Sequence, residues 1–394
     1  MPSELPGLIA RYAERLHATL GDAHHVASPL GAWLVLALAA SARPGAGVEE
    51  ALGCSAADAR GHASALLERP HRAVGAAAAV WTRADRRTPA LQAWEDGLSA
   101  AVERGPVPSQ EDADAWAADR THGLIEKFPL AVHPRTLLVL ASALATDVNW
   151  AEPFAAVPAA ELGPTRWPLE TVLRSGRTHR ARLSTDAEAG DLAVHVARSG
   201  DEDTLTVVSV IGAPDVAPAT VLGAAHRAAI EEVRGRPAAR SLYDLPLGDG
   251  HAWTLTEEPV RTTSRGGREE RCEAILPAWE ATSRHDLMAD PRTGFRDAAE
   301  ALVPLLPPEP AGSEAEAVQS ALAKYSRTGF AAAAVTALGL RATALIEPRD
   351  GVRRIATLRF GRPYAVVAVA EQSGGPWSGV PVFSAWVAAP SDAG

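Results

Sequence analysis

The order of helical and strand-like segments predicts an α+β fold. Patterns typical of helices dominate the first part of the chain, and β-branched runs that end at turn residues are interspersed later. The two kinds of segment do not alternate in the regular way that βαβ units require. No internal repeat is present in the sequence. We therefore expect an α+β architecture.

The first helices are predicted from periodicity and capping. Apolar side chains recur at helical spacing through residues 1–20, which indicates an amphipathic helix. Ser28 followed by Pro29 predicts the start of a second helix, because serine caps helix N-termini and proline suits the first helical position. The stretch that follows is almost entirely apolar, as in a buried core helix. A further helix is predicted over residues 112–128.

Strands are predicted where apolar residues run without interruption. Residues 137–144 form a continuous apolar run, which is typical of a strand covered on both faces. Residues 205–211 are rich in β-branched side chains and are followed by glycine and proline. Near the end of the sequence, two apolar runs at 364–370 and 380–387 flank a turn-rich segment and predict a hairpin.

The amino-acid composition limits the kinds of protein that this chain can be. The 394 residues are 47% hydrophobic and 22% charged with a net charge of −10, so a large core is expected and disorder is excluded. The acidic balance argues against a nucleic-acid partner. No apolar stretch reaches the length of a membrane span, and the first residues lack the apolar run of a secretory signal. Cys54 and Cys272 are the only cysteines, so no disulfide framework is expected, although one bridge stays open. These features predict a cytoplasmic protein.

Signatures of catalysis and of cofactors are missing from the sequence. It contains no Gly-rich phosphate loop, metalloprotease helix motif or nucleophile elbow. Its histidine pairs do not have the spacing of a standard metal site, so neither a metal nor a cofactor is predicted. Asp147, His122 and His195 are candidate acid or base groups if a reaction exists, but they form no recognisable constellation. Lysine and asparagine are rare, which indicates a genome rich in G and C.

A run of short side chains near residue 330 suggests a family. Gly329 and Phe330 are followed by Ala331, Ala332, Ala333 and Ala334 and then by Val335 and Thr336. Other motifs occur elsewhere in a fixed order. They are Ala27-Ser28-Pro29-Leu30, residues 42–45, Trp116 with Thr121, Gly123 and Ile125, residues 138–154 ending in Asn149-Trp150 and Pro153-Phe154, Ile275-Leu276-Pro277 with Asp286-Leu287 and Gly294-Phe295, and residues 360–364 and 382–390. Together they resemble a divergent bacterial member of the serpin family, with only residues 155–240 matching poorly.

The resemblance implies a fold and a mechanism. It implies one serpin-like domain over residues 1–394, with three β-sheets, eight or nine helices and an exposed reactive-centre-like loop within residues 327–359. Serpins offer this loop to a protease, and after cleavage the loop hinge enters a metastable sheet as a new strand. The hinge would comprise Arg327, Gly329, Phe330 and the four alanines. Small side chains and a glycine suit such a movement.

Several positions depart from the serpin pattern. Phe330 stands where a small residue is expected, and burying a phenyl ring in a packed interior costs roughly 1–3 kcal/mol unless a cavity awaits it. Arg327 and Ala278 replace the two partners of an ion pair at the base of the loop. Ser142 and Gln319 replace an asparagine and a histidine of the sheet-opening network, while Ser28 is retained and Trp150 is expected to fill core space.

The candidate cleavage region is also shifted, because the loop is several residues longer than the family usually allows. Candidates for the scissile region are Arg341, Ala342, Thr343, Ala344 and Arg349, with Arg353 and Arg354 as further trypsin-like sites.

Two functions of different classes follow. The first is a suicide-substrate inhibitor of a serine or cysteine protease. The alternative is a non-inhibitory serpin-fold protein, recruited either as a binding module for a small molecule or peptide or as a biosynthetic enzyme. The departures at Phe330 and Arg327 and the longer loop all fall on the moving part, which suggests altered function. Neither a nucleic acid nor a membrane is expected as a partner.

Overall fold

The computed structural model describes residues 4–43, 46–163, 167–200, 204–264, 266–307, 315–330 and 349–393. The chain divides into two compact units. Unit one comprises Met1–Thr146, Ala281–Ala323 and Ala368–Ala385, and unit two comprises Asp147–Glu280, Lys324–Val367 and Trp386–Gly394.

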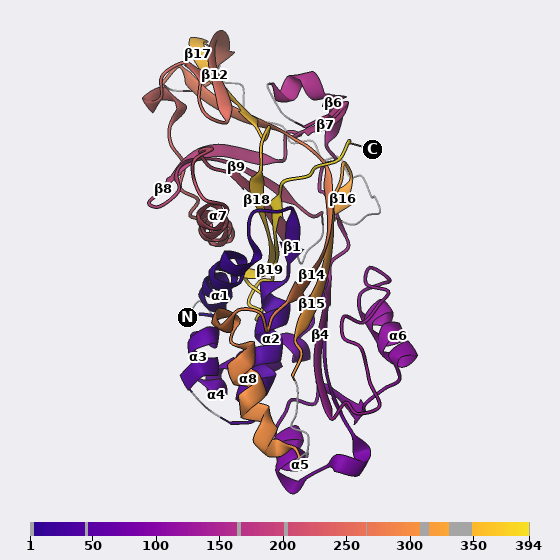
Figure 1. The fold of residues 1–394 in the computed structure, drawn as a ribbon. Helices are drawn as coiled ribbons and strands as arrows, with labels where there is room; N and C mark the ends of the chain where they lie inside the picture. The colour runs from indigo at the N-terminus through magenta and orange to yellow at the C-terminus, as the bar shows by residue number, and fades with distance from the viewer. Residues whose placement is uncertain are drawn as a thin grey trace. The chain divides into compact units, whose positions relative to one another are not determined.

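Unit one contains most of the helices. They are α1 (Leu5–Leu20), α2 (Pro29–Ala40), α3 (Ala46–Leu52), α4 (Ala56–Glu68), α5 (Pro89–Asp96), α6 (Gln110–Arg120) and α8 (Phe295–Leu302), with short 3-10 helices at Ala84–Arg86, Pro291–Thr293 and Val303–Leu305. The predicted cap of α2 is confirmed, because the Ser28 hydroxyl accepts a hydrogen bond from the Gly31 amide. Helix α2 is buried along nearly its whole length and packs against α1, α3, α4 and α8 (Figure 1).

The helix predicted over 112–128 is shorter than expected at its end. Helix α6 begins at Gln110, where Ser109 caps it, and ends at Arg120. The chain cannot continue as a helix because His122 and Gly123 adopt left-handed conformations with φ of 52° and 80°. Phe128 is instead brought back onto the sheet, 5.6 Å from the Trp81 ring centroid.

One sheet lies entirely in unit one. It contains β2 (Gly75–Thr82), β3 (Glu103–Pro106) and β4 (Leu138–Ala145) in the order β3-β2-β4. Strand β4 confirms the strand predicted at 137–144, and both its faces are packed. Leu138 and Leu140 pack against one apolar cluster, and Val139 and Ala141 belong to another. The short strand β1 (His25–Ala27) precedes α2.

Four strands contain points at which the chain passes from one unit to the other. They are β14 (Trp279–Asp286), β15 (Val318–Tyr325), β18 (Tyr364–Glu371) and β19 (Val380–Val387). The predicted C-terminal hairpin is confirmed, because β18 and β19 are hydrogen-bonded neighbours and the Gly379 amide donates to the Ala370 carbonyl at 2.9 Å.

Unit two is built mainly from strands. They are β5 (Val148–Asn149), β6 (Ala155–Pro158), β7 (Thr171–Arg174), β8 (Arg180–Asp186), β9 (Gly190–Arg198), β10 (Thr204–Ile211), β11 (Gly248–Asp249), β12 (Trp253–Thr262), β13 (Arg268–Leu276), β16 (Gly329–Phe330) and β17 (Arg349–Arg359). One sheet has the order β11-β12-β17-β13-β7-β6. Strand β10 confirms the strand predicted at 205–211; it pairs antiparallel with β9, which pairs antiparallel with β8. Helix α7 (Pro218–Val233) packs against β10, and short 3-10 helices occur at Ala159–Leu162 and Leu242–Asp244.

The α+β class is confirmed by these elements. The described residues form eight α-helices and four sheets, one sheet more than predicted. The extra sheet arises because β2, β3 and β4 form a sheet of their own, while β14, β15, β16 and β5 form another. In the described part of the chain, no helix is both long and apolar enough to cross a membrane.

Candidate functional site at the base of the loop

Residues 326–330 form a tight turn at the end of β15, which we call the loop base. Tyr325 pairs with Phe330 across this turn. The Ser326 amide and its hydroxyl both donate to the Gly329 carbonyl, each at 3.0 Å. The same hydroxyl accepts from the Gly329 amide at 3.2 Å. Ser326 therefore closes the turn with its backbone and its side chain together.

The loop base is also bound to the segment around β5. Gly329 pairs with Asn149, and Phe330 pairs with Val148. The Trp150 amide donates to the Thr328 carbonyl at 3.0 Å. Two further donors reach the turn, the Phe154 amide to the Arg327 carbonyl at 2.9 Å and the Trp150 indole to the Ser326 carbonyl at 3.0 Å. The carbonyls of residues 326–329 thus all accept hydrogen bonds.

Gly329 occupies a position that excludes a side chain. A Cβ atom built there would lie 2.3 Å from the Val148 carbonyl oxygen. That contact is with backbone, which cannot swing away as a flexible side chain can. The close pairing of β16 with β5 therefore requires glycine at this position.

Phe330 lies in an aromatic cluster and is only 3% exposed. Its ring centroid is 6.5 Å from that of Trp150 and 6.3 Å from that of Trp279, which it meets edge-on. Tyr325 packs between them, 5.0 Å from Trp150 and stacked on Trp279 at 6.1 Å. Such ring geometries are favourable beyond the apolar area they bury. The fold therefore contains a space that accommodates the Phe330 ring.

A second layer of rings lies behind the cluster. Phe154 is 5.6 Å from Tyr325 and only 4.3 Å from His179, centroid to centroid. His179 stacks on His195, and the His179 Nδ1 and His195 Nε2 atoms are 3.1 Å apart. Burial lowers the pKa of both imidazoles, most strongly for His195, whose side chain is fully buried. His195, a candidate acid or base from the sequence, is thus a packed residue of this layer.

The remaining predicted residues of this region lie in two places. Arg327 is exposed, whereas Ala278 is a buried methyl group whose carbonyl accepts from the Ser391 amide at 2.8 Å. In unit one, Gln319 bonds both backbone groups of Ser28, accepting from its amide at 2.9 Å and donating to its carbonyl at 2.8 Å. The Ser142 hydroxyl donates to the Gly31 carbonyl at 2.8 Å. Gln319 and Ser142 therefore still make polar contacts to the start of α2.

Most of the predicted loop lies outside the described residues. This applies to Ala331, Ala332, Ala333, Ala334, Arg341, Ala342, Thr343 and Ala344. Arg349 is the first residue of β17, and its Nε donates to the Ser264 carbonyl at 3.0 Å. Arg353 and Arg354 lie within the same strand, where they bond Glu269 at 2.7 Å and Glu257 at 3.0 Å. Because β17 is paired with β12 and β13, Arg353 and Arg354 are not presented to a protease as an exposed, extended cleavage site.

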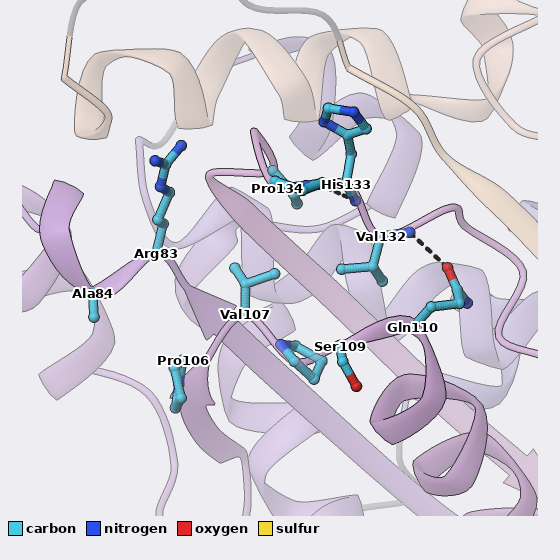
Figure 2. Close-up of a pocket in the computed structure, with 11 residues that line it drawn as sticks. Arg83, Ala84, Pro106, Val107, Ser109, Gln110, Val132, His133 and Pro134 are labelled. Atoms are coloured by element: carbon cyan, nitrogen blue, oxygen red, sulfur yellow. Dashed lines mark hydrogen bonds between the residues drawn. The ribbon is translucent and has the colours of Figure 1, made fainter.

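A surface pocket lies in unit one. Its volume is about 440 Å³, and it lies between β3, the start of α6 and the segment before β4 (Figure 2). Its polar side chains already serve local structure. Gln110 accepts from the Val132 amide at 2.8 Å, Ser109 caps α6, and Arg83 bonds Asp85 at 3.0 Å.

The sequence singled out Trp150, Phe154 and Phe330 but did not indicate their partners. Trp279, Tyr325 and His179 come from other parts of the chain and meet these rings only in the folded unit.

Comparison with solved structures decides the fold. Over 98% of its length the chain matches 94% of the crystal structure of a thermophilic serpin, tengpin, in the native state, with a TM-score of 0.65 and 15% identity. The chain has the serpin fold. A serpin from Arabidopsis in its native stressed conformation matches at a TM-score of 0.59 and 14% identity, covering 98% of this chain and 97% of that one.

A protein that binds a small molecule is also among the matches. The crystal structure of human thyroxine-binding globulin complexed with thyroxine matches at a TM-score of 0.62 and 12% identity, covering 99% of each chain. No protein-family model and no curated protein sequence matches the chain.

Proposed function

We propose that this protein is a serpin-type protease inhibitor that acts by inserting its own cleaved loop into a sheet. The observation that carries the proposal is the pairing of the loop base. Phe330 pairs with Tyr325 on one side and with Val148 on the other, both antiparallel. This is the first step of an inserted strand, already formed before any cleavage. Because Phe330 is already buried in this arrangement, its ring would not have to enter the core during insertion.

The register of this pair defines which residues would follow. Counting onward from Phe330 and backward from Tyr325, Ala331 would face Lys324, Ala332 would face Ala323, and Ala337 would reach Val318 at the start of β15. The segment that would line β15 is thus Ala331 to Ala337, in which every side chain is small. Larger residues begin only at Leu338, beyond the end of β15. The sequence therefore fits insertion in the register that the structure sets.

The side chains and the neighbours of strand β15 are compatible with pairing to this segment. Its buried face carries Ala321, Ala323 and Tyr325, while Lys324 is exposed. Strand β14 lies on one edge of β15, and the ladder partner on the other edge is β16, which is two residues long. Because directly opposed residues in a sheet share a face, Ala332 would point into the core with Ala323, and Ala331 would point outward with Lys324.

The partner we propose is a serine or cysteine protease that cleaves between Phe330 and Arg349. Arg341 offers a trypsin-like site, and Ala342, Thr343 and Ala344 remain further candidates. Arg349 is a weaker choice because it already belongs to β17. The acidic chain gives no basis for a nucleic-acid partner. A cytoplasmic setting fits the free thiols of Cys54 and Cys272.

The test compares two neighbouring substitutions during proteolysis. Wild type, Ala332→Glu and Ala331→Glu are incubated with trypsin-like and subtilisin-like proteases, and SDS-stable complexes and melting temperatures are measured. We expect wild type and Ala331→Glu to form complexes and to melt at higher temperature after cleavage. Ala332→Glu should be cleaved but form no complex, because its carboxylate would have to enter the core opposite Ala323. Cleavage of wild type in the loop without complex or stabilisation would refute the proposal.

The alternative is a non-inhibitory serpin-fold protein that binds a small molecule or a peptide. The observation that favours it is the firm attachment of the loop base, whose four carbonyls are bonded while the family's ion pair is replaced by Arg327 and Ala278. The fold is compatible, since thyroxine-binding globulin shares it. A ligand-dependent rise in melting temperature that persists in a variant lacking residues 339–348 would support this function over inhibition.

A further inference from the structure

We propose that His179 and His195 form an acid-sensitive latch that holds the loop base, so that protonation of His179 frees the loop for movement. The inference rests on the proposed function in that it treats the loop base as the moving part. It adds a means of regulation that the inhibitor mechanism itself does not require.

The hydrogen bonds fix where the protons of the latch lie. The His179 Nε2 atom is 2.7 Å from the Glu152 carbonyl oxygen, which can only accept, so this nitrogen carries the proton. In the neutral ring Nδ1 is then the acceptor, and it takes the proton of His195 Nε2 at 3.1 Å. The other nitrogen of His195, Nδ1, is buried, and no hydrogen-bond partner reaches it within the described residues. The hydrogen bonds of the latch therefore run in one order: His195 donates to His179, and His179 donates to the Glu152 carbonyl.

Protonation of His179 breaks this chain of bonds. The second proton must go to Nδ1, which then faces the N–H of His195 as donor against donor. His195 is fully buried, whereas His179 is half-buried and lies directly before β8. The imidazolium of His179 is expected to move out to solvent, because a charged ring is costly to keep in contact with apolar rings.

The charged and titratable groups around His179 only partly oppose the movement of its protonated ring out to solvent. The Glu152 carboxylate attracts the protonated ring, and it stays ionised because backbone amides at Thr178 and Arg177 lower its pKa. His195 on β9 is the other titratable neighbour, and Tyr325 lies beyond Phe154. Burial outweighs the attraction of Glu152 and lowers the pKa of His179 below its usual value of 6.5. The neutral latch is thus fully present at and above pH 6.5, and it is lost as the pH falls through the lowered pKa of His179.

Phe154 connects the latch to the loop base. Its ring is the closest aromatic neighbour of His179, at 4.3 Å, and its amide holds the Arg327 carbonyl at 2.9 Å. When His179 leaves, Phe154 loses the packing on one side, and the hydrogen bond to Arg327 weakens with it. The bond from the Trp150 amide goes to the Thr328 carbonyl, the next residue of the same turn, and should weaken together with it.

Hydrogen exchange at these two amides tests the latch directly. After correction for intrinsic rates, protection of the Trp150 and Phe154 amides should fall severalfold in wild type between about pH 7.5 and about pH 5. His179→Gln should abolish this pH dependence, because a glutamine side chain can still donate to Glu152 and accept from His195 but does not titrate. His251→Gln is the matched control. His251 is a half-buried histidine of the same unit whose pKa burial also lowers, and its loss should leave the response intact.

Three results would overturn the latch. They are constant protection of the two amides in wild type, an unchanged pH response in His179→Gln, or loss of the response in His251→Gln. Should His179→Gln fail to fold, an NMR titration of the wild-type His179 ring replaces it, and a midpoint at or above 6.5 would contradict the latch. None of these readouts uses a protease. A pH response without inhibition would therefore refute the proposed function alone, and inhibition without a pH response would refute the latch alone.

Discussion

At the scale of single residues, the loop base depends on one glycine and one phenylalanine. Gly329 allows the backbone to approach Val148, and Phe330 fills the space between Trp150 and Trp279. The sequence showed the glycine and the departure at Phe330. It could not show the pocket, because Trp150 and Trp279, two of the rings that form it, are more than a hundred positions apart in the chain.

Gly329→Ala is predicted to destabilise the protein by about 1–3 kcal/mol, the usual cost of forcing an extra group into a packed site. The added Cβ would collide with the Val148 carbonyl at 2.3 Å, so β16 must separate from β5. Urea unfolding measures the loss. Gly61→Ala in α4 is the control, since nothing lies within 4 Å of its Cβ and alanine favours the helix. Equal stability of the two variants would show that the close approach at Gly329 is not needed.

Phe330→Ala is predicted to lower the free energy of unfolding by about 3–5 kcal/mol, because it leaves a cavity among rings that cannot collapse into it. The fluorescence of Trp150 and Trp279 should change at the same time, since both rings contact Phe330. A stability unchanged from wild type would mean that the Phe330 ring is not held in the cluster.

At the scale of elements, local signals predicted the start of α2, strands β4 and β10, and the C-terminal hairpin. Each depends on neighbours in sequence: a serine before a proline, a run of apolar residues, a turn between two strands. The end of α6 was mispredicted because His122 adopts a left-handed conformation. A positive φ is uncommon for residues other than glycine, so the residue type gave no reason to expect it. The division of strands into four sheets was missed because the pairing of β16 with β5 depends on contacts distant in sequence.

The link between β15 and the start of α2 gives a prediction at this scale. Gln319→Ala removes the acceptor of the Ser28 amide, and Ser28 is only 5% exposed. A buried donor left without its acceptor costs about 1–3 kcal/mol, so the midpoint of urea unfolding should fall accordingly. Gln110→Ala serves as the control, because its bonds at the surface are open to replacement by water. If both variants lose the same stability, Gln319 does not connect the two elements.

At the scale of the whole molecule, buried histidines predict how stability depends on pH. Burial lowers the pKa of His25 to about 4 and that of His226 to about 3, and it lowers that of His195 as well. These values lie below the 6.5 of an unfolded histidine, so the stabilisation is complete above pH 6.5 and is lost as the pH falls toward 4. Each proton taken up on unfolding costs about 1.4 kcal/mol per pH unit. Urea midpoints at about pH 7.5 and 5 should differ clearly; equal midpoints would contradict the burial of these rings.

We also propose that the 394 residues unfold as one domain, although two compact units are distinguishable. Strands β14, β15, β18 and β19 each contribute residues to both units, so neither unit is a continuous piece of chain. Circular dichroism and tryptophan fluorescence should therefore report a single, coincident urea transition. Two separate transitions would show that the units fold independently.

The central claim is that the loop base is the first step of an inserted strand. The measurement that tests it most directly is the melting temperature before and after a single cleavage within residues 331–348. Insertion of Ala331 to Ala337 beside β15 adds a strand to the sheet, so the cleaved protein should melt at a distinctly higher temperature than the intact one. An unchanged or lower melting temperature after cleavage would contradict the account.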